Sequence, residues 1–441
     1  MKKFSLKAWV RSLTTDQKDT LLAIVIVLVV AAIYYFQWAY YLTGLEDSKV
    51  NIGQPSRYFW WANDAVTYRA AGEWLFGRDA NQMIAIRPWV YPFLLGLART
   101  IFGGRAEGVM WISQFLMWLG SGLFIYLALR NAVKSTPIAI IGAGLFFSHP
   151  TPLLLTFHGM TESLNFLLIA IFCWLLTTNK KRYLYYALLT LVIVTVTKPI
   201  YLVHIILLIG YIFIRDKQTS RLKQVGIITL ILIPIWIQLI LSFIAAGKVT
   251  ISSIGSSTFR EYLVADVYMQ VEGTEWHPTM ALIEDWSLQD QLTYLWDHKA
   301  LTVLTYRNHI IDDNLWTGSF FALGEGNRAS GFAISFNAVA AYLHLLMAPL
   351  VIYYFFSSKY KGNKELVAIL YLTMLVQFAT SGISTGQEDR LLITAMPLWV
   401  ITYLVVLKGL LTRQSEPVTQ LSDKVVGASQ VKTPSRQRRK G

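Results

Sequence analysis

Residues 58–92 read YFWWANDAVTYRAAGEWLFGRDANQMIAIRPWVYP, and this segment decides how we interpret the fold of the whole chain. It begins shortly after the first long apolar run. It contains Asp64 among aromatic residues, then a short amphipathic pattern, then Arg87 ahead of a further apolar run. We interpret it as an extramembrane loop with a short helix. We expect later parts of the chain to complete a membrane-embedded site around Asp64.

The composition is that of a membrane protein. The 441 residues are 54% hydrophobic with a mean hydropathy of +0.45, far from a soluble globular composition. Apolar runs long enough to span a bilayer recur along the sequence, which predicts an all-α polytopic membrane protein. The first run, residues 21–41, has no small-residue cleavage site and is interpreted as a retained helix. The single cysteine, Cys173, lies within an apolar run, so no internal disulfide can form.

The net charge of +13 also fits a membrane protein. In a soluble chain such an excess suggests a nucleic-acid partner. Here the basic residues lie in short loops and tails, and the bias of cytoplasmic loops toward Lys and Arg explains them better. We therefore expect no nucleic-acid partner. Residues 1–19 are basic and should form a cytoplasmic N-terminus, so residues 44–106 form the first extracytoplasmic loop.

The short apolar run 88–102 sets the topology. It has about fifteen residues and is broken by Pro and Gly, which is typical of an interfacial or re-entrant helix. If it does not cross the membrane, every later basic loop lies on the cytoplasmic side. Because the span ending in His149-Pro150-Thr151-Pro152 is short, we expect it to be broken or tilted. The ten predicted spans are residues 21–41, 107–130, 137–152, 159–178, 183–198, 200–215, 224–246, 334–357, 365–381 and 391–411.

The predicted transmembrane domain, residues 20–411, contains one sizeable insertion at 247–333. The insertion holds eleven of the 26 acidic residues, against five basic ones, and has amphipathic helical patterns. We expect a small helical cap on the extracytoplasmic side. The polar tail 412–441 ends in RQRRKG and should be disordered, cytoplasmic and able to contact anionic lipid. We place the protein in the plasma or inner membrane, with both termini cytoplasmic.

Polar residues not used in deriving the topology test it, because they gather at the outer ends of the predicted spans. Ionisable groups in membrane segments are costly and usually mark a substrate path. Their convergence on one face suits an enzyme that works at the outer surface, whereas a transporter more often places such groups near the bilayer midplane. The candidate site residues are Asp64, Arg87, His158, Glu162, Lys198, Glu388 and Arg390.

Asp64 is the strongest catalytic candidate. Surrounding aromatic residues could raise the pKa of this carboxyl and make it a general base. Alternatively, it could bind a divalent cation such as Mg²⁺ or Mn²⁺ that neutralises a phosphate leaving group. The structural alternative is that Asp64 caps a helix beginning at Ala65, because aspartate is a favoured N-cap residue.

The other candidates also have structural alternatives. His158 suits an interface histidine, and Glu162 suits a helix start, where the helix dipole favours a carboxylate. Lys198 and Arg390 suit contact with a lipid phosphate, although snorkelling to the headgroups would also explain them. The chain has no Walker A motif, Rossmann glycine fingerprint, HExxH or GxSxG, so nucleotide hydrolysis and zinc proteolysis are unsupported.

Four short motifs spread over most of the chain carry a family resemblance. The motifs are NDAVTY at 63–68, RPWVYPFLLGLARTIFG at 87–103, Pro150 followed by TESL at 161–164, and TKP at 197–199. With them the chain resembles the GT-C class of membrane glycosyltransferases, where many relatives have Arg-Pro in place of TKP. This class includes protein O-mannosyltransferases, the aminoarabinose transferases of lipid A and the mannosyltransferases of GPI-anchor assembly.

This resemblance implies polyprenyl-phosphate-linked sugars as donors. It implies a catalytic or metal-associated role for the acidic residue of the first loop, which is Asp64 here. By charge and placement, Lys198 and Arg390 would contact the donor phosphate. Many relatives have two adjacent acidic residues where this chain has Asn63-Asp64, so metal binding stays open.

We predict an inverting transferase that moves a sugar from a polyprenyl phosphate to a glycan, lipid or protein acceptor outside the membrane. One rival is an enzyme similar to an O-antigen ligase or polymerase, but its key site would be expected in a late large loop, and here that loop is acidic. The other rival is a lipid or sugar transporter or flippase. It would have functional charges at mid-membrane and no dependence on Asp64.

Overall fold

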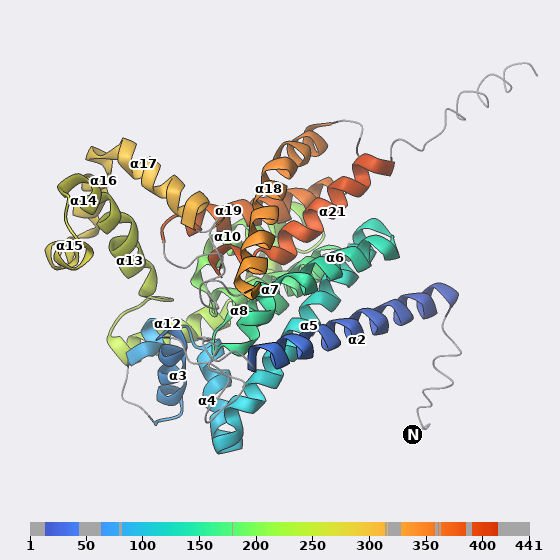
Figure 1. The fold of residues 1–441 in the computed structure, drawn as a ribbon, viewed down its shortest axis with the longest axis horizontal. Helices are drawn as coiled ribbons and strands as arrows, with labels where there is room; N and C mark the ends of the chain where they lie inside the picture. The colour runs from blue at the N-terminus through green and yellow to red at the C-terminus, as the bar shows by residue number, and fades with distance from the viewer. Residues whose placement is uncertain are drawn as a thin grey trace, which may run out of the picture.

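The structure is a computed structural model that describes residues 14–43, 63–78, 82–178, 180–313, 315, 328–357, 360, 363–384 and 390–412. Every regular element in these ranges is a helix, so the predicted all-α class is confirmed for them (Figure 1). The predictions made for residues 1–13, for most of the first loop at 44–62 and for the tail from 413 concern residues outside the described part.

The main bundle contains long helices and short apolar ones. Its elements are α2 (Thr15–Thr43), α5 (Ala106–Val133), α6 (Thr136–Ser148), α7 (Pro150–Leu154), η3 (Leu155–Phe157), α8 (Glu162–Leu176), α9 (Lys181–Thr195), η4 (Pro199–Tyr201), α10 (Leu202–Arg215), α11 (Arg221–Ile231), α12 (Ile233–Ala246), α18 (Arg328–Phe356), α19 (Lys364–Ser381), α20 (Arg390–Ile393) and α21 (Met396–Thr412).

Four helical stretches among the described residues are long and apolar enough to cross a membrane: Gln17–Ala39, Val90–Val133, Ile334–Phe356 and Lys364–Ser381. Two bent pairs, α6 with α7–η3 at 61° and α11 with α12 at 46°, bring the number to six if each counts as one span. These helices indicate a multi-pass membrane protein. Each of the ten predicted spans coincides with helix, although length and apolarity identify only four to six of them as spans.

The break expected near His149 is present, because α6 ends at Ser148 and α7 begins at Pro150. Proline cannot continue the preceding helix, and the His149 ring accepts a hydrogen bond from the Thr151 backbone N–H instead. The bend between α11 and α12, by contrast, divides a span that the sequence had predicted as continuous.

The stretch Val90–Val133 folds back on itself. The helix α4 (Val90–Phe102) ends at Gly103, whose φ of 55° lies in the left-handed region, and η2 (Gly103–Arg105) leads into α5. The Tyr91 hydroxyl donates to Gln114 Oε1 at 3.0 Å, yet 23 residues of straight helix would hold these groups about 35 Å apart. With 13 residues, α4 is about 20 Å long, which is shorter than the membrane core.

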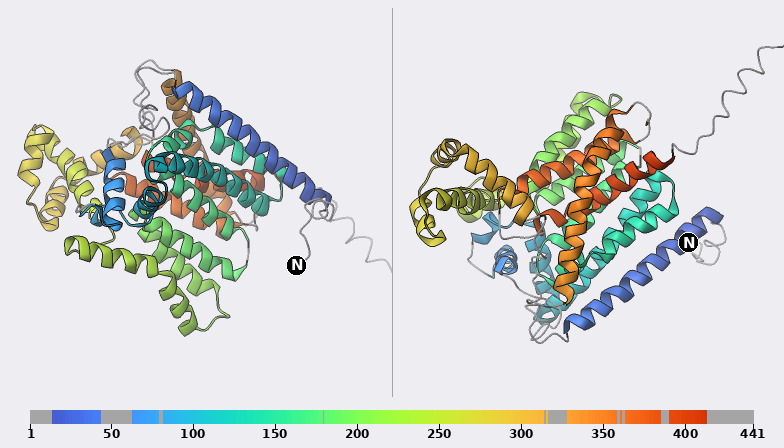
Figure 2. Two further views of the ribbon diagram at one scale, coloured as in Figure 1. Left: turned by 90° about the horizontal axis from the view of Figure 1, so that it is seen from below. Right: turned by 45° about the horizontal axis from the view of Figure 1, so that its top comes forward.

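The two ends of the bundle differ. The start of α2 and the end of α21 lie at one end, and the helices α13 to α17 project from the other (Figures 1 and 2). Between them, α5, α8 and α21 pack closely in the centre around fully buried aromatic side chains such as Trp118, Tyr126 and Phe166. A single bundle therefore separates the end carrying both described termini from the end carrying the insertion.

The described part of the insertion is helical, as expected. Its elements are α13 (Ile254–Thr258), η5 (Phe259–Val264), α14 (Ala265–Glu272), α15 (Trp276–Ile283), α16 (Leu288–Asp297), α17 (Lys299–Asn308) and η6 (His309–Asp313). They enclose a small hydrophobic cluster of their own that includes Leu263, Val267 and Ile283. The insertion contacts the bundle where Ser253 N–H donates to Ala85 O and where the His309 ring meets Gly382 O.

Candidate functional site

Two short helices at the insertion end of the bundle are formed by the segment 58–92. They are α3 (Asn63–Leu75), which carries Asp64 in its first turn, and η1 (Gln82–Ala85), which ends just before Arg87. Because α3 begins at Asn63, Asp64 lies inside the helix, and the structural alternative, an N-cap for a helix beginning at Ala65, is wrong. The chain reversal between them brings Arg87 back to Asp64, with Arg87 Nη2 at 2.6 Å from Asp64 Oδ1.

A glycine contact fixes how α3 sits against α4. A Cβ atom added to Gly72 would lie 2.5 Å from the Pro92 carbonyl oxygen, and one added to Gly96 would lie 2.6 Å from the Gly72 carbonyl oxygen. No side chain fits at such distances, so glycine at both positions allows the two backbones to touch. This close crossing holds α3, and with it Asp64, near the start of α4.

Asp64 forms ion pairs with two arginines from distant parts of the chain. Arg390 Nη1 lies 2.6 Å from Asp64 Oδ2, so each carboxylate oxygen meets a different guanidinium group. Arg87 also donates from Nε to Thr67 Oγ1 at 2.8 Å, and its guanidinium lies 4.7 Å from the centre of the Tyr68 ring. Charge-assisted hydrogen bonds of this length are among the strongest in proteins.

Arg390 continues the network inward to a second carboxylate. Its Nε donates to Glu162 Oε1 at 2.7 Å, and Lys198 Nζ lies 3.8 Å from the same oxygen. Glu162 begins α8 and Lys198 precedes η4, so the cluster unites five separate segments. We call Asp64, Arg87, Glu162, Lys198 and Arg390 the ionic network.

The side chains of the ionic network become more deeply buried from Asp64 toward Glu162. The Asp64 side chain is 32% exposed, whereas those of Arg390 and Glu162 are 6% and 1% exposed. Three cations face two carboxylates, so the network has one positive charge in excess when Lys198 is protonated. Glu162 Oε2 is buried and has no hydrogen-bond partner among the described residues. Because of its excess positive charge, the network can accept an additional anion.

The pKa of Asp64 is lowered, so the expected raised value is wrong. Burial raises this pKa, but the charges and hydrogen bonds of Arg390 and Arg87 outweigh burial. Aromatic neighbours in sequence gave no sign of these two cations. A carboxylate held in this way is a weak base until one of its arginines finds another partner.

Burial lowers the pKa values of Lys198 and His158, as expected for groups that are charged when protonated. Burial lowers the pKa of Lys198 to about 8, and the charge of Glu162 partly offsets it. Burial, together with the charge of Arg390, lowers the pKa of His158 well below its usual value, so this ring is neutral. The His158 carbonyl accepts a hydrogen bond from Gln114 Nε2 at 2.8 Å. His158 therefore lies beside the ionic network and adds no charge to it.

Several residues that support the network were not singled out from the sequence. Tyr68 meets the Tyr91 ring edge-on at 5.6 Å, and Tyr91 donates to the buried amide of Gln114. Gln114 also donates to the carbonyl groups of Thr156 and His158, so it ties α4 and α5 to the segment before α8. An amide in the middle of a predicted apolar span was the signal that could have found it.

A second polar cluster holds α20, the turn that begins with Arg390. Gln377 Nε2 donates to Leu391 O at 3.0 Å, and the Tyr201 hydroxyl donates to Gln377 Oε1 at 3.0 Å. Gln377 also contacts Thr394 Oγ1. These groups are buried, and a buried hydrogen-bonded cluster of this kind rigidifies its surroundings. The position of Arg390 is therefore fixed from η4 and α19.

The predicted divalent cation finds no suitable ligand set in this arrangement. Both Asp64 oxygens already accept from guanidinium groups, whose charge would repel Mg²⁺ or Mn²⁺. The residues that the structure describes contain no group of three or more His, Cys, Asp or Glu side chains able to hold a metal ion. The remaining candidate, Glu388, lies outside the described residues.

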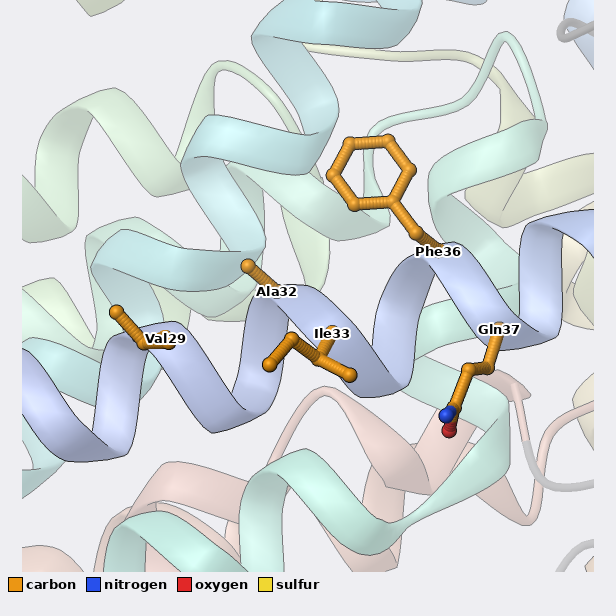
Figure 3. A pocket seen from close by; sticks show the side chains of 5 residues that line it. All are labelled: Val29, Ala32, Ile33, Phe36 and Gln37. Atoms are coloured by element: carbon orange, nitrogen blue, oxygen red, sulfur yellow. The ribbon is translucent and has the colours of Figure 1, made fainter.

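A pocket along α2 has no such chemistry. A pocket of about 530 Å³ follows the face of α2 and is lined by Val29, Ala32, Ile33, Phe36 and Gln37 (Figure 3). It holds no titratable side chain, and the neighbouring side chains of α2 are largely exposed and apolar. In a membrane this face suits contact with lipid chains.

No protein-family model matches the sequence, and comparison with curated proteins finds no match. A function therefore has to be inferred from the geometry and charge of the ionic network.

Proposed function

We propose that this protein is an integral membrane glycosyltransferase that moves a sugar from a polyprenyl phosphate to an acceptor outside the membrane. The observation that carries the proposal is the ionic network. It joins three cations and two carboxylates from five chain segments at one end of an apolar bundle. Its excess positive charge suits a phosphate, and its place at the end of a bundle of apolar helices suits a lipid-linked one.

The cations would stabilise the leaving group. As the bond between the anomeric carbon and the phosphate oxygen breaks, the bonding electrons go to the phosphate, whose negative charge increases. Arg87 and Arg390 present planar groups that can bind phosphate oxygens in pairs, and Lys198 adds a point charge beneath them. Donors that are already in place where charge develops account for much of the rate enhancement at sites of this kind.

Asp64 would act on the acceptor. A donor phosphate competes with Asp64 for Arg87 and Arg390, and its arrival weakens the contacts that lower the pKa of this carboxyl. Asp64 then aligns the acceptor hydroxyl, whose oxygen forms the new bond to the anomeric carbon. The hydroxyl proton passes to Asp64 as that bond forms. Attack opposite the phosphate gives inversion at the anomeric carbon.

The proposed topology extends the four to six spans that length and apolarity support. The short apolar helices α8, α10 and α21 and the less apolar α9 would cross as well, which gives about ten spans with both termini cytoplasmic. The insertion would then lie outside, beside the ionic network. Resemblance to the GT-C class supports the polyprenyl-phosphate donor. The acceptor could be a glycan, a lipid or a protein, and Mg²⁺ or Mn²⁺ enters no step.

The proposal is tested with the purified full chain in lipid vesicles that contain a labelled polyprenyl-phosphate sugar and a membrane extract as the acceptor source. We expect release of polyprenyl phosphate together with labelled product. A panel of donors that differ in the sugar covers the unknown specificity. Movement of intact donor across the vesicle with no release of polyprenyl phosphate from any donor would contradict the proposal and favour a flippase.

A further inference from the structure

A second polar pocket lies at the other end of the bundle. It has a volume of about 450 Å³ and is formed where α8 ends, α9 begins, α10 ends and α19 begins. Because α8 begins at Glu162 and has 15 residues, this pocket lies about 22 Å from the ionic network along the helix axis. It is therefore a separate site, at the end of the bundle where both described termini lie.

The lining combines two kinds of side chain. Its rim carries four cations, Lys180, Lys181, Arg215 and Lys364, against the single carboxylate of Glu365. Its wall is aliphatic and comes from the leucine and isoleucine side chains of α8, α9 and α19. A cationic rim above an apolar wall is complementary to a molecule with an anionic head and hydrocarbon chains.

The pairing within the rim leaves positive charge available. Arg215 Nη2 lies 3.2 Å from Glu365 Oε2, which also accepts from the Tyr211 hydroxyl at 3.0 Å. Both members of that ion pair are 57% exposed, so the pair is weak and can open toward a ligand. Lys180 is exposed and has no ion-pair partner among the described residues.

We propose that this pocket binds the phosphate-bearing headgroup of an anionic membrane lipid. Basic pockets between transmembrane helices suit such headgroups, because the charge holds the phosphate while the apolar wall receives the first part of a chain. A soluble phosphate ester could use only the rim. The proposal needs neither the glycosyltransferase activity nor a particular orientation of the protein in the membrane.

The test compares lipid binding by two variants of equal charge. The double variant Lys180→Gln, Arg215→Gln removes the two rim cations that carry no buried partner. The control, Lys217→Gln, Lys223→Gln, removes two exposed cations outside the pocket, one from the α10–α11 connection and one from the first turn of α11. Each purified full-length protein is titrated in uncharged detergent with a fluorescent phosphatidylglycerol, and its thermal unfolding is recorded without lipid.

We expect the rim variant to bind phosphatidylglycerol at least about tenfold more weakly than the wild type, with the control within about twofold. Loss of two charge-assisted contacts accounts for this difference. Phosphatidylcholine should bind the wild type no better than phosphatidylglycerol binds the rim variant. Glycerol phosphate should fail to displace phosphatidylglycerol from the wild type. Equal binding by the rim variant and the control would overturn the proposal. So would displacement by glycerol phosphate at matched concentration, which would assign the rim to a soluble phosphate.

Discussion

At the scale of single residues, Lys198 gives the ionic network a pH dependence. Its pKa of about 8 means that it is largely protonated at pH 7 and loses its charge as the pH rises through 8. If Lys198 holds the donor phosphate, kcat/KM for the donor should fall above pH 8, by about tenfold at pH 9 relative to its plateau. The measurement is the pH profile of kcat/KM between pH 6 and about pH 9.5.

The variant Lys198→Arg is the matched control for that profile. Arginine keeps its charge over the whole range, so the decline above pH 8 should disappear even if the plateau is lower. Glu162, Asp64 and Arg390 face Lys198 and stay charged in both proteins. An unchanged decline in Lys198→Arg would assign the titration to a different group.

Much of the candidate site could be found from single residues, but its pairing could not. Charge at the ends of apolar segments indicated Asp64, Glu162, Lys198 and Arg390, because ionisable groups there are costly to keep. Sequence gave no sign that Asp64 would meet Arg390, 326 positions away, and so predicted the wrong direction for the pKa of Asp64. Pairing across the chain depends on packing, which periodicity does not contain.

At the scale of helices, the crossing of α3 and α4 should be sensitive to a single methyl group. In Gly72→Ala, the new Cβ would meet the Pro92 carbonyl oxygen, and backbone cannot move aside as a side chain can. We expect a loss of about 1–3 kcal/mol of stability, in line with overpacked sites. Thermal unfolding in detergent measures this loss, and transfer activity should fall further because Asp64 is displaced.

Gly108→Ala in α5 is the control, because no atom lies within 4 Å of its added Cβ. An alanine there should leave stability unchanged or raise it slightly, since alanine favours helix over glycine. If Gly72→Ala behaves like Gly108→Ala in both assays, the close contact does not position Asp64.

Proline explains where helix boundaries could be predicted. Pro150 and Pro152 indicated the break after α6, and the structure has it there. Pro234, in the first turn of α12, is an equivalent signal for the bend at Leu232. For the segment around Gly103, the sequence predicted a short helix broken by Pro and Gly, but not the chain reversal. The reversal brings Tyr91 to Gln114, and hydrophobic periodicity does not report contacts between separate segments.

At the scale of the whole molecule, the two ends of the bundle should lie on opposite sides of a membrane. The single cysteine, Cys173, is buried, so an engineered cysteine can be labelled without background. We expect Asp285→Cys, exposed on the insertion, to react with a membrane-impermeant maleimide in intact cells. Lys223→Cys, at the opposite end, should react only after the membrane is opened. The reverse pattern would contradict the proposed orientation.

The all-α class followed from composition and from the recurring apolar runs. The predicted ten spans exceed the four to six that length and apolarity identify, because α8, α9 and α10 have 14 or 15 residues each and would depend on their neighbours rather than on their own length. Packing determines their tilt, because α8 lies against α5 and α21 while α9 and α10 pack against each other, and a hydropathy pattern does not report these contacts.

Under the proposed function, Asp64 acts on the acceptor while its two arginines bind the donor phosphate. The most direct measurement is steady-state transfer from a labelled polyprenyl-phosphate sugar by Asp64→Asn, beside wild type and Glu73→Gln, which changes a carboxylate on the same helix that pairs with Arg69 and Arg99. We expect Asp64→Asn to lower kcat by about 10²- to 10⁴-fold with the KM for the donor unchanged or lower, because the phosphate no longer competes with a carboxylate. Glu73→Gln should transfer normally. Full retention of kcat in Asp64→Asn would contradict the proposed function.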